Sequence, residues 1–220
     1  ECKTGNILAC ASYPTYNLET MHEDWKEIEE NPYNPFFNRA FGAEYPPGST
    51  FKMCTLIAAM ENKNSKGEII HPYKTEIKDE GVWNKLEGFA PTCLAWTSGR
   101  YTHGVIDATL ALCYSCNYFF YELGYLLDEF MPVETAKSLG LGVPSGIELV
   151  EKTGSLNTRE RKKEVYGSGV NANFSAGDRI LGAIGQGEYR FTPLQLCVYA
   201  ATLANKGTRM KATFLSRVVS

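Results

Sequence analysis

From residue 50 onward the chain contains apolar stretches made of residues that favour helices. Residues 50–62 (TFKMCTLIAAMEN) are rich in Met, Leu, Ala and Glu, which are favourable residues in a helix. Pro46, Pro47 and Gly48 oppose a helix immediately before them. The pattern therefore predicts a helix that begins at or beside Ser49.

Two further stretches have the same character. Residues 107–127 (DATLALCYSCNYFFYELGYLL) are apolar almost throughout and start with the capping residue Asp107, which predicts one long helix. Residues 192–205 start with Thr at the N-cap position and Pro at the first helical position, and Lys206-Gly207 follows them. We expect a helix here as well.

Between these helices the pattern is less regular. A short apolar run over residues 5–16 predicts a strand, and residues 132–139 predict a short helix. Residues 62–104 predict surface loops with short hairpin pieces, and residues 150–178 predict loop. No internal repeat or linker divides the chain, so one domain is expected.

Composition places the chain in the globular class. Its 220 residues are 44% hydrophobic and 21% charged, with a formal net charge of -3. This charge, without a local run of Lys or Arg, disfavours nucleic acid or an anionic membrane as the main partner. The sequence contains no apolar stretch of membrane-spanning length and no signal peptide at its start, so we expect a soluble piece cut from a longer protein.

The 7 cysteines are odd in number and far apart, which disfavours a disulfide framework. Cys113 and Cys116 form a Cys-x-x-Cys pair, but without a second pair this is a weak metal or redox signal. Helical spacing favours two buried, small apolar residues instead. The 3 histidines are scattered, so neither a metal nor a cofactor is expected.

Ser49 and Lys52 are the first candidates for chemistry. Their spacing places both side chains on one face of a helix start, where the lysine amine could take the serine hydroxyl proton during attack on a carbonyl. A lysine does this only when neutral, and the apolar residues around Lys52 are expected to bury it and lower its pKa. The alternative is a capping serine followed by a solvated lysine, because Ser-x-x-Lys also occurs by chance.

Ser115 and Asn117 are the second pair of candidates. They lie amid Leu, Tyr and Phe, where an unpaired hydroxyl or amide is costly to bury. Either a functional site uses them, or both bond to backbone carbonyls.

Taken together in order along the chain, these motifs resemble the transpeptidase domain of class B penicillin-binding proteins, a family that combines Ser-x-x-Lys with Ser-x-Asn and Lys-Thr-Gly. The similarity runs from residue 3 to about residue 212 in the family's order. The segments that carry it are Gly5-Asn6-Ile7-Leu8-Ala9, Ser12-Tyr13-Pro14, Asn38-Arg39-Ala40, Tyr45 to Lys52, His103-Gly104, Ser115 to Phe119, Gly140-Leu141-Gly142 with Gly146-Ile147, Gly185-Gln186-Gly187 and Thr192 to Leu196.

The resemblance implies a mixed α/β (α+β) fold, of the penicillin-recognising serine transpeptidase and β-lactamase type, with a helical lobe and an incomplete antiparallel sheet. It implies a D,D-transpeptidase acting on peptidoglycan stem peptides at the outer face of the bacterial cytoplasmic membrane. The implied anchor lies outside this chain, and the implied partners are elongation, division or sporulation proteins. β-Lactams would be covalent inhibitors.

The resemblance also implies a role for each candidate. Ser49 would attack the D-alanyl-D-alanine carbonyl, and its backbone N–H would be one oxyanion-hole donor. Lys52 would be the base. Ser115 would relay a proton through Lys52 to the leaving amine, and Asn117 would bond the substrate's backbone amide.

The chain departs from the family at the third motif. Lys-Thr-Gly occurs as Lys3-Thr4-Gly5 and as Lys152-Thr153-Gly154, and neither copy is where the family places its catalytic one. We therefore expect residues 1–220 to be a partial transpeptidase domain that lacks its C-terminal sheet strands and has little turnover of its own. A strand over residues 5–16 without its partners would invite association.

Two alternatives of other classes stay open. A serine β-lactamase or a β-lactam sensor shares Ser-x-x-Lys, and fast deacylation would single out the β-lactamase. A non-catalytic cell-wall scaffold would tolerate replacement of Ser49 by Ala.

Overall fold

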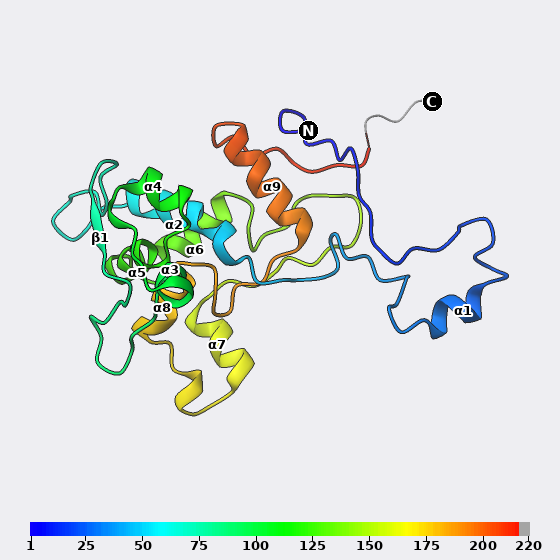
Figure 1. Ribbon diagram of the computed structural model, residues 1–220. Coiled ribbons are helices and arrows are strands. Elements are labelled where there is room, and N and C mark those ends of the chain that lie inside the picture. The colour runs from blue at the N-terminus through cyan, green and yellow to red at the C-terminus, as the bar shows by residue number, and fades with distance from the viewer. Residues whose placement is uncertain (216–220) are drawn as a thin grey trace. The chain divides into compact units, whose positions relative to one another are not determined.

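The computed structural model describes residues 1–215, which divide into two compact units (Figure 1). Unit 1 combines Glu1–Tyr45, Leu139–Gly154 and the described residues from 190 onward. Unit 2 combines Pro46–Ser138 and Ser155–Tyr189. No helix within residues 1–215 is long and apolar enough to cross a membrane.

Unit 2 is built around helices that are buried on most sides. Helix α5 (Asn117–Leu126) packs against α8 (Ala176–Gly182), and α2 (Lys52–Glu61) packs against both α5 and α6 (Met131–Ser138). A helix that is apolar around its whole circumference belongs in a core, and Phe119, Phe120 and Leu123 of α5 are fully buried. The predicted helices at residues 50–62 and 132–139 are confirmed.

A small antiparallel sheet lies at the edge of this core. Strand β1 (Ile77–Asp79) pairs with β2 (Gly104–Ile106), in the register Ile77 to Ile106 and Asp79 to Gly104. Short helices flank it: α3 (Leu94–Gly99) precedes β2, and α4 (Ala108–Cys113) follows it. This sheet is not one of the hairpin pieces expected in residues 62–104, because α3 lies between its two strands. The isolated antiparallel bridges of Lys63 with Ile69 and of Val82 with Thr92 are the hairpin pieces in that range.

One loop expected from the sequence is helical. Residues 150–178 contain α7 (Arg159–Tyr166) and the 3₁₀ turn η2 (Val170–Ala172). The sequence RERKKEVY has no apolar stripe, and none of its residues is buried. Helix α7 is therefore stabilised by interactions within and beside the helix and not by packing on the core. The Thr158 hydroxyl caps it by accepting from the Arg161 N–H, and Arg161 pairs with Glu164 at 3.2 Å.

In unit 1 the helix predicted after Thr192 is α9 (Pro193–Ala204). Thr192 and Gln195 form a capping box, with each side chain accepting from the backbone N–H of the other. Gln195 is fully buried, and its Nε2 donates to the carbonyls of Val143 (2.9 Å) and Thr153 (2.8 Å). This side chain therefore ties α9 to the 139–154 segment.

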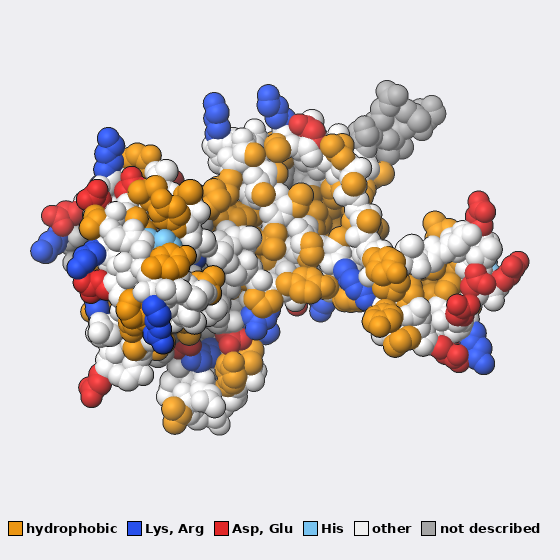
Figure 2. All heavy atoms as spheres, in the orientation of Figure 1, with side chains coloured by type: hydrophobic (Ala, Val, Ile, Leu, Met, Phe, Trp, Pro, Cys, Tyr) orange, Lys and Arg blue, Asp and Glu red, His pale blue; other side chains and the backbone are white. Residues whose placement is uncertain are grey.

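The rest of unit 1 contains little regular structure. Its other helix, α1 (Trp25–Glu30), carries an acidic sequence. Figure 2 shows orange apolar side chains gathered beside the charged ones in this segment, and the exposed aromatic residues there include Trp25, Tyr33, Phe36 and Phe37. Tyr16 and Trp25 both contact the Phe36 ring, at centroid distances of 4.9 Å.

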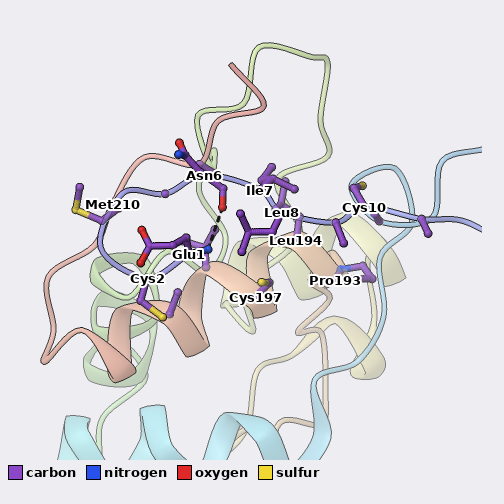
Figure 3. A pocket seen from close by; sticks show the side chains of 17 residues that line it. Glu1, Cys2, Asn6, Ile7, Leu8, Cys10, Pro193, Leu194, Cys197 and Met210 are labelled. Carbon is purple, nitrogen blue, oxygen red and sulfur yellow. Dashed lines mark hydrogen bonds between the residues drawn. The ribbon is translucent and has the colours of Figure 1, made fainter. Parts of the chain in front are cut away.

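The strand predicted over residues 5–16 does not form within the described part of the chain. Asn6 makes one isolated parallel bridge with Thr213, and residues 7–16 have no strand assignment. A strand needs a hydrogen-bonded neighbour along its length, and here only the first residues have one. The segment instead covers an apolar groove of about 400 Å³ along α9 (Figure 3), where Ile7 and Leu8 lie beside Leu194 and Cys197.

Candidate active site

Ser49 lies on a 3₁₀ turn, η1 (Gly48–Phe51), that leads directly into α2. Phe51 is fully buried, and its ring packs on Tyr189 with 4.2 Å between centroids. Ser49 itself is exposed. The turn is thus anchored on its core side while the serine hydroxyl remains accessible, which a nucleophile requires.

A glycine that is remote in sequence makes a hydrogen bond with the turn. The Gly48 N–H donates to the Gly185 carbonyl at 3.1 Å. A β-carbon on Gly185 would lie 2.8 Å from the carbonyl carbon and 2.9 Å from the nitrogen of Gly48, closer than side chains approach. Gly185 also has φ +74, a conformation natural to glycine. The Gly-Gln-Gly segment therefore supports the loop that carries Ser49.

Lys52 is buried at the first position of α2, with 1% of its surface exposed. Its Nζ donates to Oδ1 of Asn117 (2.6 Å), to the Ser115 carbonyl (2.7 Å) and to Oγ of Ser115 (3.0 Å). Burial lowers the pKa of Lys52 from 10.5 to about 8. The prediction of a buried lysine with a lowered pKa is confirmed, and the solvated-lysine alternative is wrong.

The long helix predicted over residues 107–127 is interrupted at Ser115. Helix α4 ends at Cys113, and α5 starts at Asn117. The Ser115 N–H donates to the Leu112 carbonyl (3.1 Å) and the Cys116 N–H to the Ala111 carbonyl (2.9 Å). These bonds form a Schellman motif, with Ser115 in its left-handed position at φ 51.

This break brings Ser115 and Asn117 to Lys52. Glycine usually occupies the left-handed position of such a motif, so a serine there gave no sequence signal for the break. The left-handed turn directs the Ser115 carbonyl as well as its hydroxyl at Nζ of Lys52. The prediction that the pair bonds only to backbone carbonyls is wrong, because both side chains contact Lys52.

The arrangement can move a proton. A charged lysine amine uses all its N–H groups on the acceptors from Ser115 and Asn117. A neutral amine keeps a lone pair, and the Ser115 hydroxyl can then reverse and donate to Nζ. Lys52 and Ser115 are thereby able to pass a proton between them, one helical turn after Ser49.

A second cluster of polar side chains lies next to this group. Asp79, Cys93, His103 and Cys116 each offer one ligand atom, and these atoms all lie within 4.8 Å of one another. Nδ1 of His103 is 2.7 Å from Oδ2 of Asp79, and Sγ of Cys93 is 3.8 Å from Sγ of Cys116. One carboxylate, one imidazole and two thiols are ligands of the type that hold Zn²⁺ in tetrahedral sites, so this cluster could hold such an ion.

The sequence analysis missed this cluster because its members come from four separate segments. The Cys-x-x-Cys pair contributes only Cys116, since Cys113 is exposed at the end of α4. The expectation that both are buried in one helix is wrong. The proximity of Asp79 and His103 depends on the pairing of β1 with β2.

Hydrogen bonds govern protonation in the cluster. The bond between the two thiols lowers the pKa of Cys93 and raises that of Cys116. Burial alone would raise the pKa of Asp79, but N–H donors from His103 and Gly81 outweigh it and lower the pKa.

Both Lys-Thr-Gly copies belong to unit 1 and lie outside β-strands. The Gly154 N–H donates to Oε1 of Glu44 (2.9 Å), and the Thr153 carbonyl accepts from Gln195. These contacts give the second copy a structural role. That neither copy is the catalytic motif stays a prediction.

Comparisons with known proteins place this geometry in a family. The family model described as "Penicillin binding protein transpeptidase domain" matches residues 1–220. The chain is 31% identical over 214 residues to the peptidoglycan D,D-transpeptidase MrdA of Haemophilus influenzae, covering 93% of this chain and 30% of that protein. The chain therefore spans about a third of the length of this relative.

Solved structures agree with the sequence match. The complex of PBP2 with MreC from Helicobacter pylori matches with a TM-score of 0.85 and 25% identity, covering 98% of this chain and 38% of that one. The penicillin G acyl-enzyme complex of penicillin-binding protein A from M. tuberculosis matches with a TM-score of 0.72 and 26% identity, covering 97% and 46%. The predicted mixed α/β fold of this family is confirmed. The chain belongs to the penicillin-binding protein transpeptidase domain family.

Proposed function

We propose that this chain is the catalytic part of a peptidoglycan D,D-transpeptidase in which Ser49 is the nucleophile. The observation that carries the proposal is the group formed by Lys52, Ser115 and Asn117, one turn from an exposed serine. A buried amine with a pKa near 8 is partly neutral at physiological pH and can accept the serine proton.

Each residue has a role in this proposal. Lys52 takes the Ser49 proton as the hydroxyl oxygen attacks the carbonyl between the terminal D-alanines of a stem peptide. Ser115 returns that proton through Lys52 to the leaving amine, and Asn117 binds the amide of the substrate backbone. The backbone N–H of Ser49 stabilises the oxyanion, and the acyl group then passes to the amine of a second stem peptide.

The relatives support the inhibitor, the partners and the location that we propose. A penicillin G acyl-enzyme has been solved for penicillin-binding protein A of M. tuberculosis, and PBP2 of Helicobacter pylori has been solved with MreC. By analogy we propose that β-lactams acylate Ser49. We also propose that the whole protein works with cell-wall synthesis proteins at the outer face of the cytoplasmic membrane.

A fluorescent penicillin tests the proposal. The full-length gene product is incubated with it beside the Ser49→Ala variant, and the labelled peptide is identified by mass spectrometry. We expect stoichiometric, slowly hydrolysed labelling of Ser49 and none in the variant. Labelling at another residue would contradict the proposal, and rapid release of the label would indicate a β-lactamase.

The 220-residue chain is labelled in parallel. We expect it to react much more slowly than the full-length gene product, because neither of its Lys-Thr-Gly copies occupies the family's catalytic position. Equally fast labelling would show that the residues described here are sufficient for acylation.

A further inference from the structure

Asn157 is a buried residue of unit 2 whose side-chain amide lies between α8 and the Gly-Gln-Gly turn. Its Nδ2 donates to the Asp178 carbonyl in α8 (2.9 Å), and its Oδ1 accepts from the Glu188 N–H (3.1 Å). Glu188 directly follows the turn Gly185-Gln186-Gly187. The proposed transpeptidase reaction does not use this amide directly, yet the amide connects the helix before the turn with the residue after it.

Two glycines leave the space that this amide fills. A β-carbon on Gly182 would lie 2.5 Å from Nδ2 of Asn157, and a β-carbon on Gly187 would lie 2.7 Å from its Oδ1. Gly182 is the last residue of α8 and does not have a left-handed backbone. Contact with Asn157, and not backbone conformation, therefore excludes a side chain at this position.

Ser155 contacts the other polar group of the Glu188 backbone. Its Oγ donates to the Glu188 carbonyl at 2.6 Å, so side chains from positions 155 and 157 bind both the C=O and the N–H of one residue. The segment that carries them leads into α7, where Nζ of Lys162 lies 2.6 Å from both carboxylate oxygens of Asp178 in α8. Asn157 and Ser155 thus bind Glu188 to a segment that is itself attached to α8.

The turn needs this restraint because it is rich in glycine. Gly185 and Gly187 have φ +74 and +78, and glycine backbones sample many conformations when nothing restrains them. On the α8 side, the Gly185 N–H donates to a carbonyl at the end of the helix. On the other side, Asn157 and Ser155 fix the backbone of Glu188.

We propose that Asn157 is a positioning residue for Ser49 and that Ser155 assists it. The Gly185 carbonyl accepts from the Gly48 N–H at 3.1 Å, and Gly48 directly precedes Ser49. A turn that is held at both ends therefore fixes the start of η1, and with it the Ser49 hydroxyl. A displacement of about 1 Å at a catalytic group can cost up to about 100-fold in rate. This effect on rate rests on the proposed function, whereas the restraint of the turn does not.

The test removes the amide and then restores the stability that its loss costs. Asn157→Ala breaks both hydrogen bonds and leaves space beside Gly182. Adding Gly182→Ala to Asn157→Ala places a methyl group in that space and a better helix former in α8, so the midpoint of denaturant unfolding should move back toward the wild-type value. Ser155→Ala is a milder variant, because it removes only the bond to the Glu188 carbonyl.

Thr202→Ala is the control for a general loss of stability. It removes a buried hydroxyl of unit 1 that donates to the Val198 carbonyl (2.8 Å). Each full-length protein is mixed with fluorescent penicillin at several concentrations, which separates the affinity of the first complex from the rate constant of acylation. The final stoichiometry of labelling gives the folded fraction. Hydrogen exchange of the amides of residues 185–188 measures the restraint of the turn without any activity.

We expect the acylation rate constant to fall by about tenfold in Asn157→Ala and in its combination with Gly182→Ala, with the affinity unchanged. Ser155→Ala should have a smaller effect in the same direction, and the amides of residues 185–188 should exchange faster in all three variants. Thr202→Ala should match the wild type in both measurements. A combined variant with wild-type stability and the wild-type rate constant would overturn the proposal.

Two further outcomes are decisive. If the Asn157 variants do not fold, a wild-type rate constant and wild-type exchange in Ser155→Ala would overturn the proposal. A wild type that is not labelled at all would count against the proposed function alone. Exchange in Asn157→Ala as slow as in the wild type would then still overturn the restraint of the turn.

Discussion

The carbonyl oxygen of Ser115 lies 2.7 Å from Nζ of Lys52, and it does so because the Ser115 backbone is left-handed, at φ 51. A residue at the end of α4 in helical conformation would direct its carbonyl along the helix axis. The left-handed turn instead turns it toward the buried amine. Ser115 is therefore both a residue with a strained backbone and a residue that shapes the site.

Replacing Ser115 by Gly separates these two contributions. Glycine adopts φ 51 without strain, so Ser115→Gly should raise the free energy of unfolding by up to about 1 kcal/mol over Ser115→Ala. Both variants lack the hydroxyl and should slow penicillin acylation by on the order of 100-fold. Denaturant unfolding and labelling rates measure the two effects.

Arg100→Gly is the matched control, since Arg100 has φ 54 and lies at the end of α3. The free energy of unfolding should rise, because glycine adopts this left-handed conformation without strain, and the labelling rate should not change. Equal stability of the Gly and Ala variants at position 115 would show that the turn carries no strain.

The acylation rate should depend on pH through Lys52. Burial lowers the pKa of Lys52 to about 8, and only the neutral amine accepts the Ser49 proton. The rate should therefore rise about tenfold per pH unit below pH 8 and level off above it. Lys52→Arg, which stays charged, should be slower than the wild type by on the order of 100-fold above pH 8, and its own rate should change little with pH. A flat profile in the wild type between pH 6 and 9 would rule out this role for Lys52.

Asn117→Asp should move that profile to higher pH. The substitution places a carboxylate where an amide oxygen now lies 2.6 Å from Nζ, and a nearby negative charge favours the protonated amine. The pKa of Lys52 should rise, so that acylation requires a pH higher by about one unit or more. Asn84→Asp adds the same charge at an exposed position of unit 2 and should leave the profile unchanged.

Gly185→Ala should destabilise the Ser49 turn. The new β-carbon would collide with the Gly48 backbone, so the turn must shift, and both stability and acylation rate should fall. We expect a loss of about 2 kcal/mol or more. Gly88→Ala is the control, because Gly88 has nearly the same φ (+72 against +74) but open space around it. It should cost about 1 kcal/mol and leave labelling unchanged.

The sequence predicted the elements whose signals are local. Thr192 and Pro193 mark the start of α9, and the apolar run after Ser49 marks α2, so both helices were placed correctly. For Ser115 and Asn117, their apolar surroundings indicated only that a functional site could use these two polar residues. Their contact with Lys52 did not follow from the residues alone. The family resemblance supplied their roles, which remain proposals.

Features that depend on long-range contacts could not be predicted. The contact between Gly48 and Gly185 joins segments far apart in sequence, and the cluster around Asp79 needs the β1–β2 pairing.

The break at Ser115 was missed because serine is uncommon in a left-handed position. Helix α7 was missed because its charged sequence has no apolar stripe.

The interruption between α4 and α5 has a consequence for how the site can vary. In a continuous helix, residues two apart point in nearly opposite directions, about 200° around the axis. At this junction the side chains instead alternate as in a strand: Ser115 and Asn117 face Lys52, while Cys116 faces Asp79 and Cys93. A substitution that straightens α4 into α5 would leave all three side chains present and still take one of the two polar groups away from the lysine.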